Sequence, residues 1–516
     1  MNVFPRPKAP RGNRPSSRKE PAALVSDGSD RPKPSLRGTY AAVAGIAFTA
    51  LLMNGKVASE LARFAAIGTI ISLAFSIFAD FRAGGVRNLI RADVMAILAF
   101  YFLTLFEFLF PQEHFDTLID LATTRVATLT VLVGFCGLLF GRHIPRPKEQ
   151  PFRQTLTYEV PPVWMVMLFI ACFCVGFLHM FVAVNFDITK VIFYYMEPRF
   201  SQPWQRGQFG DWKALLVELG LFIYLIPPLA GIIIARRFRY SSGALLIVCL
   251  GLLWTFFYGF TSGTRNVFCS YLVTFLIGYA FALPRSRGRE LFVLSVGSAL
   301  VMFFATYMML QFRSVGFKNW ISNTYEPPPP GDTVLFVDYN LYAICKLVEV
   351  FPAKKDYLGL EIPYQALIRP IPRAMWPGKP EGLSVSIEDA LGVQGLTISA
   401  SFVGEAYMAG GFFMVAVIAL GFGILTGWWS FLASESNSEL GILIYASGFF
   451  ASVISMRSLF TFTTALLPTV AALVIGTYAV NKLAKQAARL LHRRAVARGR
   501  PQPRQPAPRP RQRPHA

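Results

Sequence analysis

Five arginines lie either in tight turns between apolar runs or in one unusually long polar segment. Arg265 falls in SGTRNVF and Arg457 in ASVISMRSLFTF, each with apolar residues nearby on both sides. Arg313 follows an apolar run directly, and Arg369 and Arg373 belong to RPIPRAMWPGKP. A guanidinium group keeps its charge at physiological pH and binds phosphate through two hydrogen bonds at once. These residue types therefore favour recognition of a phosphate or diphosphate group.

Each arginine also has a structural alternative. It could extend its charged end to the membrane surface, or pair with an acid such as Asp338, Glu349 or Asp389. This alternative is the stronger one for Arg199 and Arg206, which lie in a polar connection.

One acid, Glu405, enters an apolar run in FVGEAYMAGGFF. A carboxyl group in such surroundings is suited to take a proton as a general base. It equally suits the start of a helix, where the helix dipole stabilises negative charge. Both interpretations stay open. Gly404, Gly410 and Gly411 of the same stretch predict close packing of the backbone.

Apolar runs must position these residues. A membrane-spanning helix needs about 20 mainly apolar residues, and 54% of the chain is hydrophobic against 15% charged. The sequence thus predicts an all-α polytopic integral membrane protein with about 12 transmembrane helices. The predicted spans are residues 39–54, 61–79, 92–110, 122–141, 163–184, 214–235, 242–260, 266–283, 290–310, 402–432, 440–456 and 458–480. The last two could instead form one broken re-entrant hairpin.

A large loop, 311–401, separates the ninth and tenth predicted helices. Loops of this length are usually functional or disordered. This one is rich in Trp, Arg, Pro and Tyr, so we expect it to be ordered, partly helical and functional.

The charges of the connections predict the orientation in the membrane, because Lys and Arg gather on the cytoplasmic side. The connection 111–120 has three acids and no Lys or Arg. The connections predicted to face the cytoplasm are basic, namely 80–91, 142–153, 236–239 and 285–289. Only the acidic connection 434–439 disagrees. Both termini are then cytoplasmic, and the loop with its arginines is extracytoplasmic.

The two tails are basic and rich in proline. Residues 1–38 carry nine Lys/Arg and three acids, and residues 482–516 carry eleven and none, which is most of the net charge of +21. Since they hold few large apolar residues, we expect both to be disordered and to face anionic lipid rather than nucleic acid. Between them, the predicted layout is helices 1–9 in 39–310, the loop, and helices 10–12 in 402–481.

Several kinds of chemistry lack their usual pattern. The sequence has neither a phosphate-binding GxxxxGK[ST] loop nor a dinucleotide-binding fingerprint. Its six cysteines show neither a disulfide framework nor a metal spacing. The sequence predicts no metal and no cofactor.

Three pieces of the C-terminal half follow one another in a characteristic order. They are SGTRNVF, then YLGLEIPYQALIRPIPRAMWPGKP, then ISASFVGEAYMAGGFFMVAVIALGFG. Together they resemble the bacterial oligosaccharide repeat unit polymerases, the Wzy-type O-antigen and exopolysaccharide polymerases. The first six or so predicted spans match that family only in hydropathy.

The resemblance implies a fold of the GT-C kind and a metal-independent glycosyltransferase in the bacterial inner membrane. Its substrates would be undecaprenyl-diphosphate-linked oligosaccharides, held among membrane lipids. The reducing-end sugar of one chain would move from its lipid diphosphate to a hydroxyl of another unit. A chain-length regulator would be a further partner.

The candidate residues take roles in this chemistry. The catalytic candidates are Glu405, Arg265 and Arg373, since preorganised cations stabilise the charge that develops on a leaving diphosphate. The diphosphate-binding candidates are Arg313, Arg369, Arg457 and Lys379. The candidate sugar contacts are Trp376, Tyr364, Tyr407 and Asp338, and Asp338 is also the second choice for the base. For the three aromatic residues, structural packing is an equal alternative.

Two other functions fit the same features. An O-antigen ligase would use the same donor with a different acceptor. A transporter or flippase for the same lipid would suit the number of spans, although such proteins tend to show internal repeats, and no convincing repeat relates the two halves of this chain.

Overall fold

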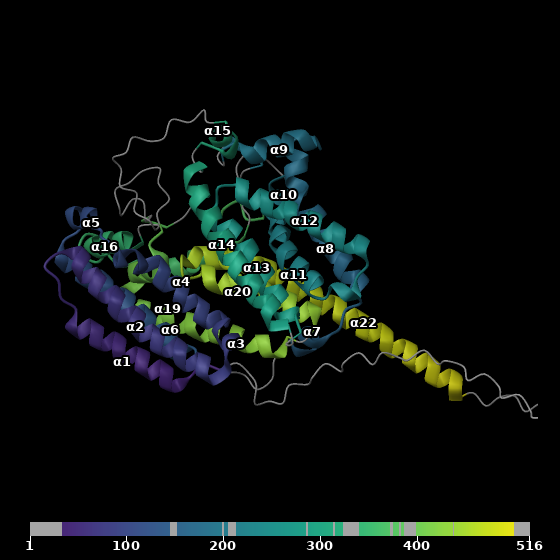
Figure 1. Cartoon of the computed structure of the whole chain (residues 1–516), viewed down its shortest axis with the longest axis horizontal. Helices are drawn as coiled ribbons and strands as arrows, with labels where there is room; N and C mark the ends of the chain where they lie inside the picture. Colours follow the sequence, from purple (N-terminus) through teal and green to yellow (C-terminus); the bar gives the residue numbers. More distant parts are fainter. Residues whose placement is uncertain are drawn as a thin grey trace, which may run out of the picture. The chain divides into compact units, whose positions relative to one another are not determined.

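The computed structural model describes most of the chain between its tails. The described residues are 33–144, 152–198, 201–204, 213–284, 287–312, 315–322, 340–371, 375–380, 383–385, 399–436 and 438–499. They belong to one unit of packed helices and include no strand. Figure 1 shows the helices by label and by their place in the sequence.

Every predicted span coincides with one or more helices. Three apolar helices are short, namely α1 (Leu36–Leu52), α4 (Ala92–Thr104) and α20 (Glu439–Ile454). Nine helical stretches of the described residues are long and apolar enough to cross a membrane: α2 (Ala58–Gly84), α6 (Leu121–Gly141), α8 (Pro162–Ala183), Leu216–Ala235, α12 (Ser242–Thr261), α13 (Arg265–Ala282), α14 (Gly288–Phe312), α19 (Ser401–Glu435) and Leu459–Leu483. The all-α membrane class is therefore confirmed, while the number of spans stays a prediction.

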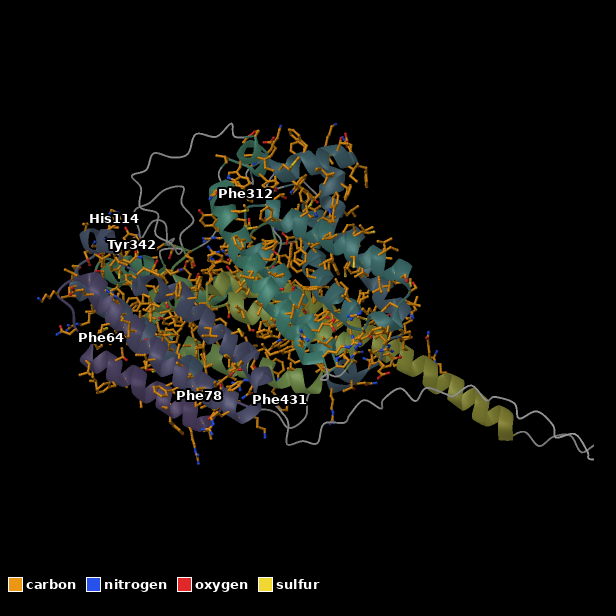
Figure 2. The ribbon with its side chains drawn as sticks, viewed as in Figure 1. Phe64, Phe78, His114, Phe312, Tyr342 and Phe431 are labelled. Carbon is orange, nitrogen blue, oxygen red and sulfur yellow. The ribbon has the colours of Figure 1, made fainter. Side chains whose placement is uncertain are left out.

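Two of these stretches contain several helices. Leu216–Ala235 combines the end of α10 (Lys213–Glu218) with η4 (Leu219–Leu225) and α11 (Ile226–Ala235). Leu459–Leu483 combines α21 (Leu459–Ala465) with the start of α22 (Leu467–Gly499). Large apolar side chains point out of the helices along much of their length, as Phe64 and Phe78 of α2 do, both of them exposed (Figure 2). An outer surface of this kind suits lipid.

Small residues bring pairs of helices into close contact. A Cβ placed on Gly141 of α6 would lie 2.8 Å from the Cα of Gly423 in α19. A Cβ on Gly278 of α13 would lie 2.5 Å from the carbonyl oxygen of Pro228 in α11. Glycine at such points lets backbones approach without a side chain between them, which is how membrane helices commonly associate.

Helix α20 connects two buried clusters. One gathers side chains of α1, α2, α4, α6 and α19, and the other those of α8, η4, α11, α13 and α20 itself. Helix α20 also packs against α4, α13, α19 and α22. Because it is apolar on all sides, it can be enclosed by other helices.

A buried network of ion pairs joins helices at the face predicted to be cytoplasmic. Arg91 and Arg142 both contact Asp80 Oδ2, at 3.1 and 3.0 Å, and Arg91 also contacts Asp93 at 2.7 Å. The hydroxyl of Thr39 accepts hydrogen bonds from Arg142. All four charged side chains are at least 98% buried, so the charges are compensated within the protein rather than by water.

The acidic connection 434–439 also has a structural explanation. Glu439 is buried and accepts hydrogen bonds from Arg236, Arg239 and the Tyr240 hydroxyl, each at 3.1 Å. The basic connection 236–239 therefore neutralises it. A rule that counts the charge of each loop separately cannot detect this pairing.

The loop 311–401 is partly helical, as expected. Its described helices are α15 (Phe317–Ile321), α16 (Asn340–Val350) and α17 (Glu361–Ile368). Helix α16 packs against α6 and α19, and α17 packs against α19 and α21. Cys345 of α16 is buried, and this burial raises the pKa of its thiol, so it is unsuited to act as a nucleophile.

The C-terminal helix differs from the prediction. We expected a disordered tail from residue 482 onward, whereas α22 continues to Gly499. The reason lies in local composition: residues 482–499 are rich in Ala, Leu, Lys and Arg, which favour helix, and the prolines begin only at Pro501. The predicted tails at 1–32 and 500–516 lie outside the described residues.

Candidate functional site

The first part of α19 bends at two glycines, and the loop attaches at the bend. Gly411 has a φ of 61°, a left-handed conformation that glycine adopts without steric cost. The backbone N–H groups of Leu358 and Gly359 donate to the carbonyl oxygens of Met408 and Ala409, at 2.9 and 3.0 Å. The bend thus presents carbonyl groups that tie the loop to the helix.

Glu405 lies one turn before this bend and is 2% exposed. Its Oε1 accepts a hydrogen bond from the Ser458 hydroxyl and its Oε2 accepts one from the backbone N–H of Leu459, both at 2.6 Å. The carboxyl group therefore caps the start of α21. Both of its oxygens hold the turn that carries Arg457.

A second set of contacts holds the same turn from the other side. The Ser399 hydroxyl donates to the carbonyl oxygen of Arg457 at 2.7 Å, and the N–H of Phe402 donates to that of Met456 at 3.3 Å. Between them, Ser401 has a φ of 58°, a strained conformation for a residue other than glycine. The end of the loop is thereby fastened to the turn between α20 and α21.

Arg369 reaches the same place from the end of α17. Its guanidinium lies 5.4 Å from the centre of the Phe460 ring, which is buried at the start of α21. Its charge is close enough to Glu405 to interact with it electrostatically. The structure thus brings Arg369, Glu405 and the turn of Arg457 together, although they are far apart in the sequence.

Lys379 lies beside the end of α17. Its ammonium group donates to the backbone carbonyl oxygens of Arg369 and Ile371, at 2.9 and 2.8 Å. It therefore fixes the chain directly after α17. This geometry favours support of Arg369 over direct contact with a diphosphate.

Arg265 begins α13, and the turn before it is fixed by local contacts. Gly263 has a φ of 63°, and the Ser262 hydroxyl donates to the carbonyl oxygen of Gly259 at 2.8 Å. Ser262 Oγ also accepts from the N–H of Thr264 at 3.3 Å. Arg265 is half-buried and lies at the positive end of the helix dipole, a setting that favours an anion.

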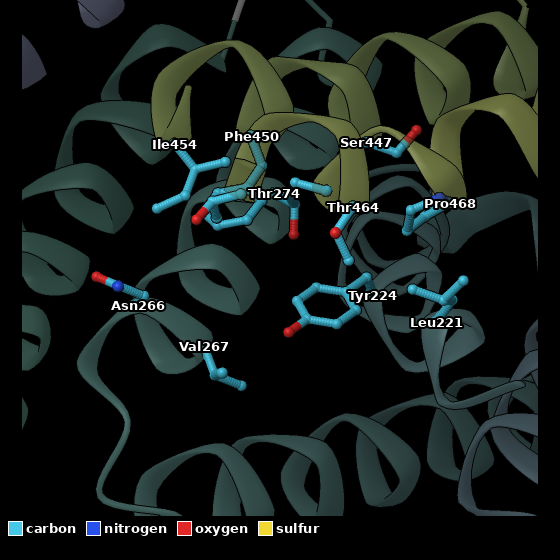
Figure 3. A pocket seen from close by; sticks show the side chains of 12 residues that line it. Leu221, Tyr224, Asn266, Val267, Thr274, Ser447, Phe450, Ile454, Thr464 and Pro468 are labelled. Carbon is cyan, nitrogen blue, oxygen red and sulfur yellow. The ribbon is translucent and has the colours of Figure 1, made fainter. Parts of the chain in front are cut away.

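A cavity of about 190 Å³ lies between α13, which begins at Arg265, and α20 and α21, which flank Arg457. Asn266, next to Arg265, lines one end, and Ile454 and Thr461 line it on either side of the Arg457 turn. Figure 3 shows Asn266 and Val267 at one end, and Leu221 and Pro468 at the other. The cavity is smaller than most ligand pockets, which hold about 300–1,000 Å³, so it can enclose only part of a large substrate.

The aromatic candidates differ in exposure. Tyr407 is 5% exposed, with its ring packed edge-on against Tyr357 and Phe412. Structural packing accounts for it. Tyr364 is 47% exposed and Trp376 is partly exposed, so both present surface to which a sugar ring could stack.

Several predicted site residues lie outside the described residues. They are Arg199, Arg206, Arg313, Asp338, Arg373 and Asp389. Within the described ranges, no three His, Cys, Asp or Glu side chains gather closely enough to hold a metal ion.

Sequence reasoning missed the residues that support the turn. Ser399 and Ser458 are such residues, and each is an ordinary polar residue in the sequence. Ser458 alone carries a signal, because a serine before an apolar helical run is a typical helix N-cap. It indeed accepts hydrogen bonds from the N–H groups of Phe460 and Thr461.

Comparison with known proteins covers this part of the chain. A family model described as a domain of unknown function (DUF8712) matches residues 337–482. No curated protein and no solved structure matches the chain. The matched segment contains α16, α17 and α19–α21, so it includes the turn of Arg457 and Glu405, and it does not include Arg265.

Proposed function

We propose that the protein is a glycosyltransferase that polymerises undecaprenyl-diphosphate-linked oligosaccharide repeat units at the extracytoplasmic face of the bacterial inner membrane. The observation that carries this proposal is the meeting of Arg369 and the Arg457 turn. A cavity lies nearby, lined by Asn266, the residue after Arg265, and by Ile454 and Thr461 on either side of Arg457. Arginines grouped next to an apolar cavity suit a ligand that has a diphosphate and a lipid chain.

The sugar is already activated by its lipid diphosphate, so the reaction needs no external energy source. It needs stabilisation of the negative charge that develops on the leaving diphosphate. A hydroxyl of the acceptor unit attacks the anomeric carbon of the donor sugar, and a new C–O bond forms. The bond between that carbon and the diphosphate oxygen breaks, so undecaprenyl diphosphate leaves with the electron pair. The hydroxyl proton passes to a base. Guanidinium groups aimed at the leaving oxygen stabilise the transition state, and loss of one such donor typically costs about 10²- to 10³-fold in rate.

Arg265 and Arg457 are the proposed diphosphate ligands, with Arg369 beside them and Arg373 and Arg313 as further candidates. Glu405 has both oxygens engaged by the turn. This geometry favours a positioning role, in which Glu405 aims Arg457, over the role of general base. The base role remains the alternative for Glu405, and Asp338 remains the second candidate for it.

Reconstitution tests the proposal directly. The purified full chain in lipid vesicles is given lipid-linked repeat units alone, and the products are separated by length. A ladder of polymers supports a polymerase. No ladder, with transfer only after a lipid core acceptor is added, would identify a ligase instead. Movement of the lipid across the bilayer without any new glycosidic bond would identify a flippase.

Variants then test the site. Arg265→Ala and Arg457→Ala are each expected to lose about 10²- to 10³-fold in activity, and Arg457→Lys should rescue poorly because an ammonium lacks the planar fork. Lys190→Ala is the matched control, since this cation lies on α9 (Ile188–Met196) with its side chain 62% exposed and pairs with Asp187. Wild-type ladders from both arginine variants would refute the site.

A further inference from the structure

A second cavity lies at the opposite ends of the helices, on the face predicted to be cytoplasmic. It has a volume of about 700 Å³ and is bordered by α11, α13 and α14. Three arginines line it, Arg237, Arg287 and Arg289, together with Glu290. Among the described lining residues, three cations therefore face one carboxylate. The excess of positive charge favours an anion.

The carboxylate of Glu290 is already shared. It accepts a hydrogen bond from Arg237 Nη1 at 2.9 Å and another from the Tyr279 hydroxyl. Arg287 Nη1 approaches it only to 3.8 Å, which is an ion-pair distance and too long for a hydrogen bond. Among the described residues, Arg287 Nη1 is buried and has no hydrogen-bond partner, although the side chain as a whole is 32% exposed. A buried charged donor without an acceptor is costly, and an anion in the cavity would supply one.

The surroundings of the cavity indicate an occupant with an apolar part. Ile234, Val293 and Leu294 also line it, and Val293 is 64% exposed on α14. Only 11% of the residues in an apolar 18-residue stretch of α14 are buried inside the protein, so this helix presents most of its surface to lipid. Phe238 is 77% exposed. The centre of its ring lies 5.2 Å from Cζ of Arg237 and 4.8 Å from Cζ of Arg287. A guanidinium over an aromatic ring is a favourable cation–π contact, so Phe238 helps to hold both arginines at the cavity.

We propose that this cavity binds the phosphate of an anionic phospholipid. Arg287 and Arg237 hold the phosphate oxygens, Arg289 adds charge at the rim, and the acyl chains lie along α14. Anionic lipids are abundant in the cytoplasmic leaflet and attract basic residues near the membrane surface. The inference is independent of the reaction proposed for the opposite face.

Binding by the purified full chain tests this site. The protein is placed in zwitterionic nanodiscs and titrated with phosphatidylglycerol, with phosphatidylcholine or with inorganic phosphate, while lipid retention is followed by native mass spectrometry. Phosphatidylglycerol alone is expected to be retained. Equal retention of phosphatidylcholine would overturn the proposal. Saturation by inorganic phosphate that displaces phosphatidylglycerol would replace it with a site for a small anion.

Variants distinguish a specific phosphate-binding site from general attraction of anionic lipid to a basic surface. Each basic residue near an anionic membrane contributes about a fivefold change in binding, so Arg287→Gln with Arg289→Gln should weaken phosphatidylglycerol binding about 25-fold. Arg82→Gln is the control, because Arg82 is exposed near the end of α2 on the same predicted face. An equal loss in the control would overturn the proposal.

Glu290→Gln provides a test that misfolding cannot imitate. It removes the competing negative charge, so binding should become about fivefold tighter. Unchanged or weaker binding in a well-folded Glu290→Gln protein would overturn the proposal.

Discussion

Replacement of Glu405 by alanine removes two hydrogen bonds from the turn that carries Arg457. The Ser458 hydroxyl and the Leu459 N–H each lose an acceptor at 2.6 Å. An orphaned buried polar group costs about 1–3 kcal/mol, so the folded state should lose about 2–6 kcal/mol. The lower end is expected, because Ser458 and Leu459 are only half-buried and water can reach them.

The effect on activity distinguishes the two roles of Glu405. If Glu405 positions Arg457, a shift of about 1 Å in the turn lowers activity about 10²-fold. Ser458→Ala should then lower activity as well, since it breaks one of the two bonds to Glu405 and also removes the N-cap contacts to Phe460 and Thr461. If Glu405 is the general base, Ser458→Ala should keep nearly full activity and Glu405→Gln should abolish it.

The assay combines polymer length with thermal stability of the detergent-purified protein. Ser455→Ala is the matched control, because the Ser455 hydroxyl donates within its own helix end, to Ser452 O at 2.6 Å. Full activity in Ser458→Ala, together with an inactive Glu405→Gln protein of unchanged stability, would refute the positioning argument and establish the base.

Three further predictions concern the fold. Asp80→Ala should lower the free energy of unfolding by about 3–5 kcal/mol, because it leaves the single carboxylate of Asp93 opposite the two buried charges of Arg91 and Arg142; a thermal midpoint equal to that of the wild type would contradict this. Gly411→Ala should destabilise the protein by about 1–2 kcal/mol from its left-handed φ of 61°. The new Cβ should cost further stability, because it would lie 2.7 Å from the Tyr357 hydroxyl oxygen. Adding Tyr357→Phe to the Gly411→Ala protein should therefore restore part of the lost stability. If it restores none, that clash is excluded. Burial and the charge of Arg142 lower the pKa of His143 to about 4. The contribution of His143 to stability should therefore be complete above its ordinary pKa of about 6.5 and be lost as the pH falls toward 4. His143→Phe should make the thermal midpoint less dependent on pH over that range, and an unchanged pH dependence would contradict the assignment.

Features that depend on composition over a short stretch could be predicted from the sequence. A membrane-spanning helix is specified by the hydropathy of about 20 consecutive residues, so each predicted run coincides with a helix. The sharp turn before Arg265 was likewise predicted from the turn residue Gly263. The helical part of the loop was predicted from the aromatic and charged composition of 311–401. The extension of α22 was missed because the tail was judged by its charge and prolines as a whole.

Only the tertiary structure decides which groups meet. Glu405 lies 53 residues from Ser458 in the sequence, and their hydrogen bond exists because α19 and α21 pack side by side. Glu439 is separated from Arg236 by 203 residues, and packing alone makes that acidic connection neutral. A hydrogen bond requires atoms within about 3 Å and in line, a condition that composition does not encode. The sequence by itself determined the membrane class and the helices, whereas tertiary packing decided that Glu405 holds the turn that carries Arg457.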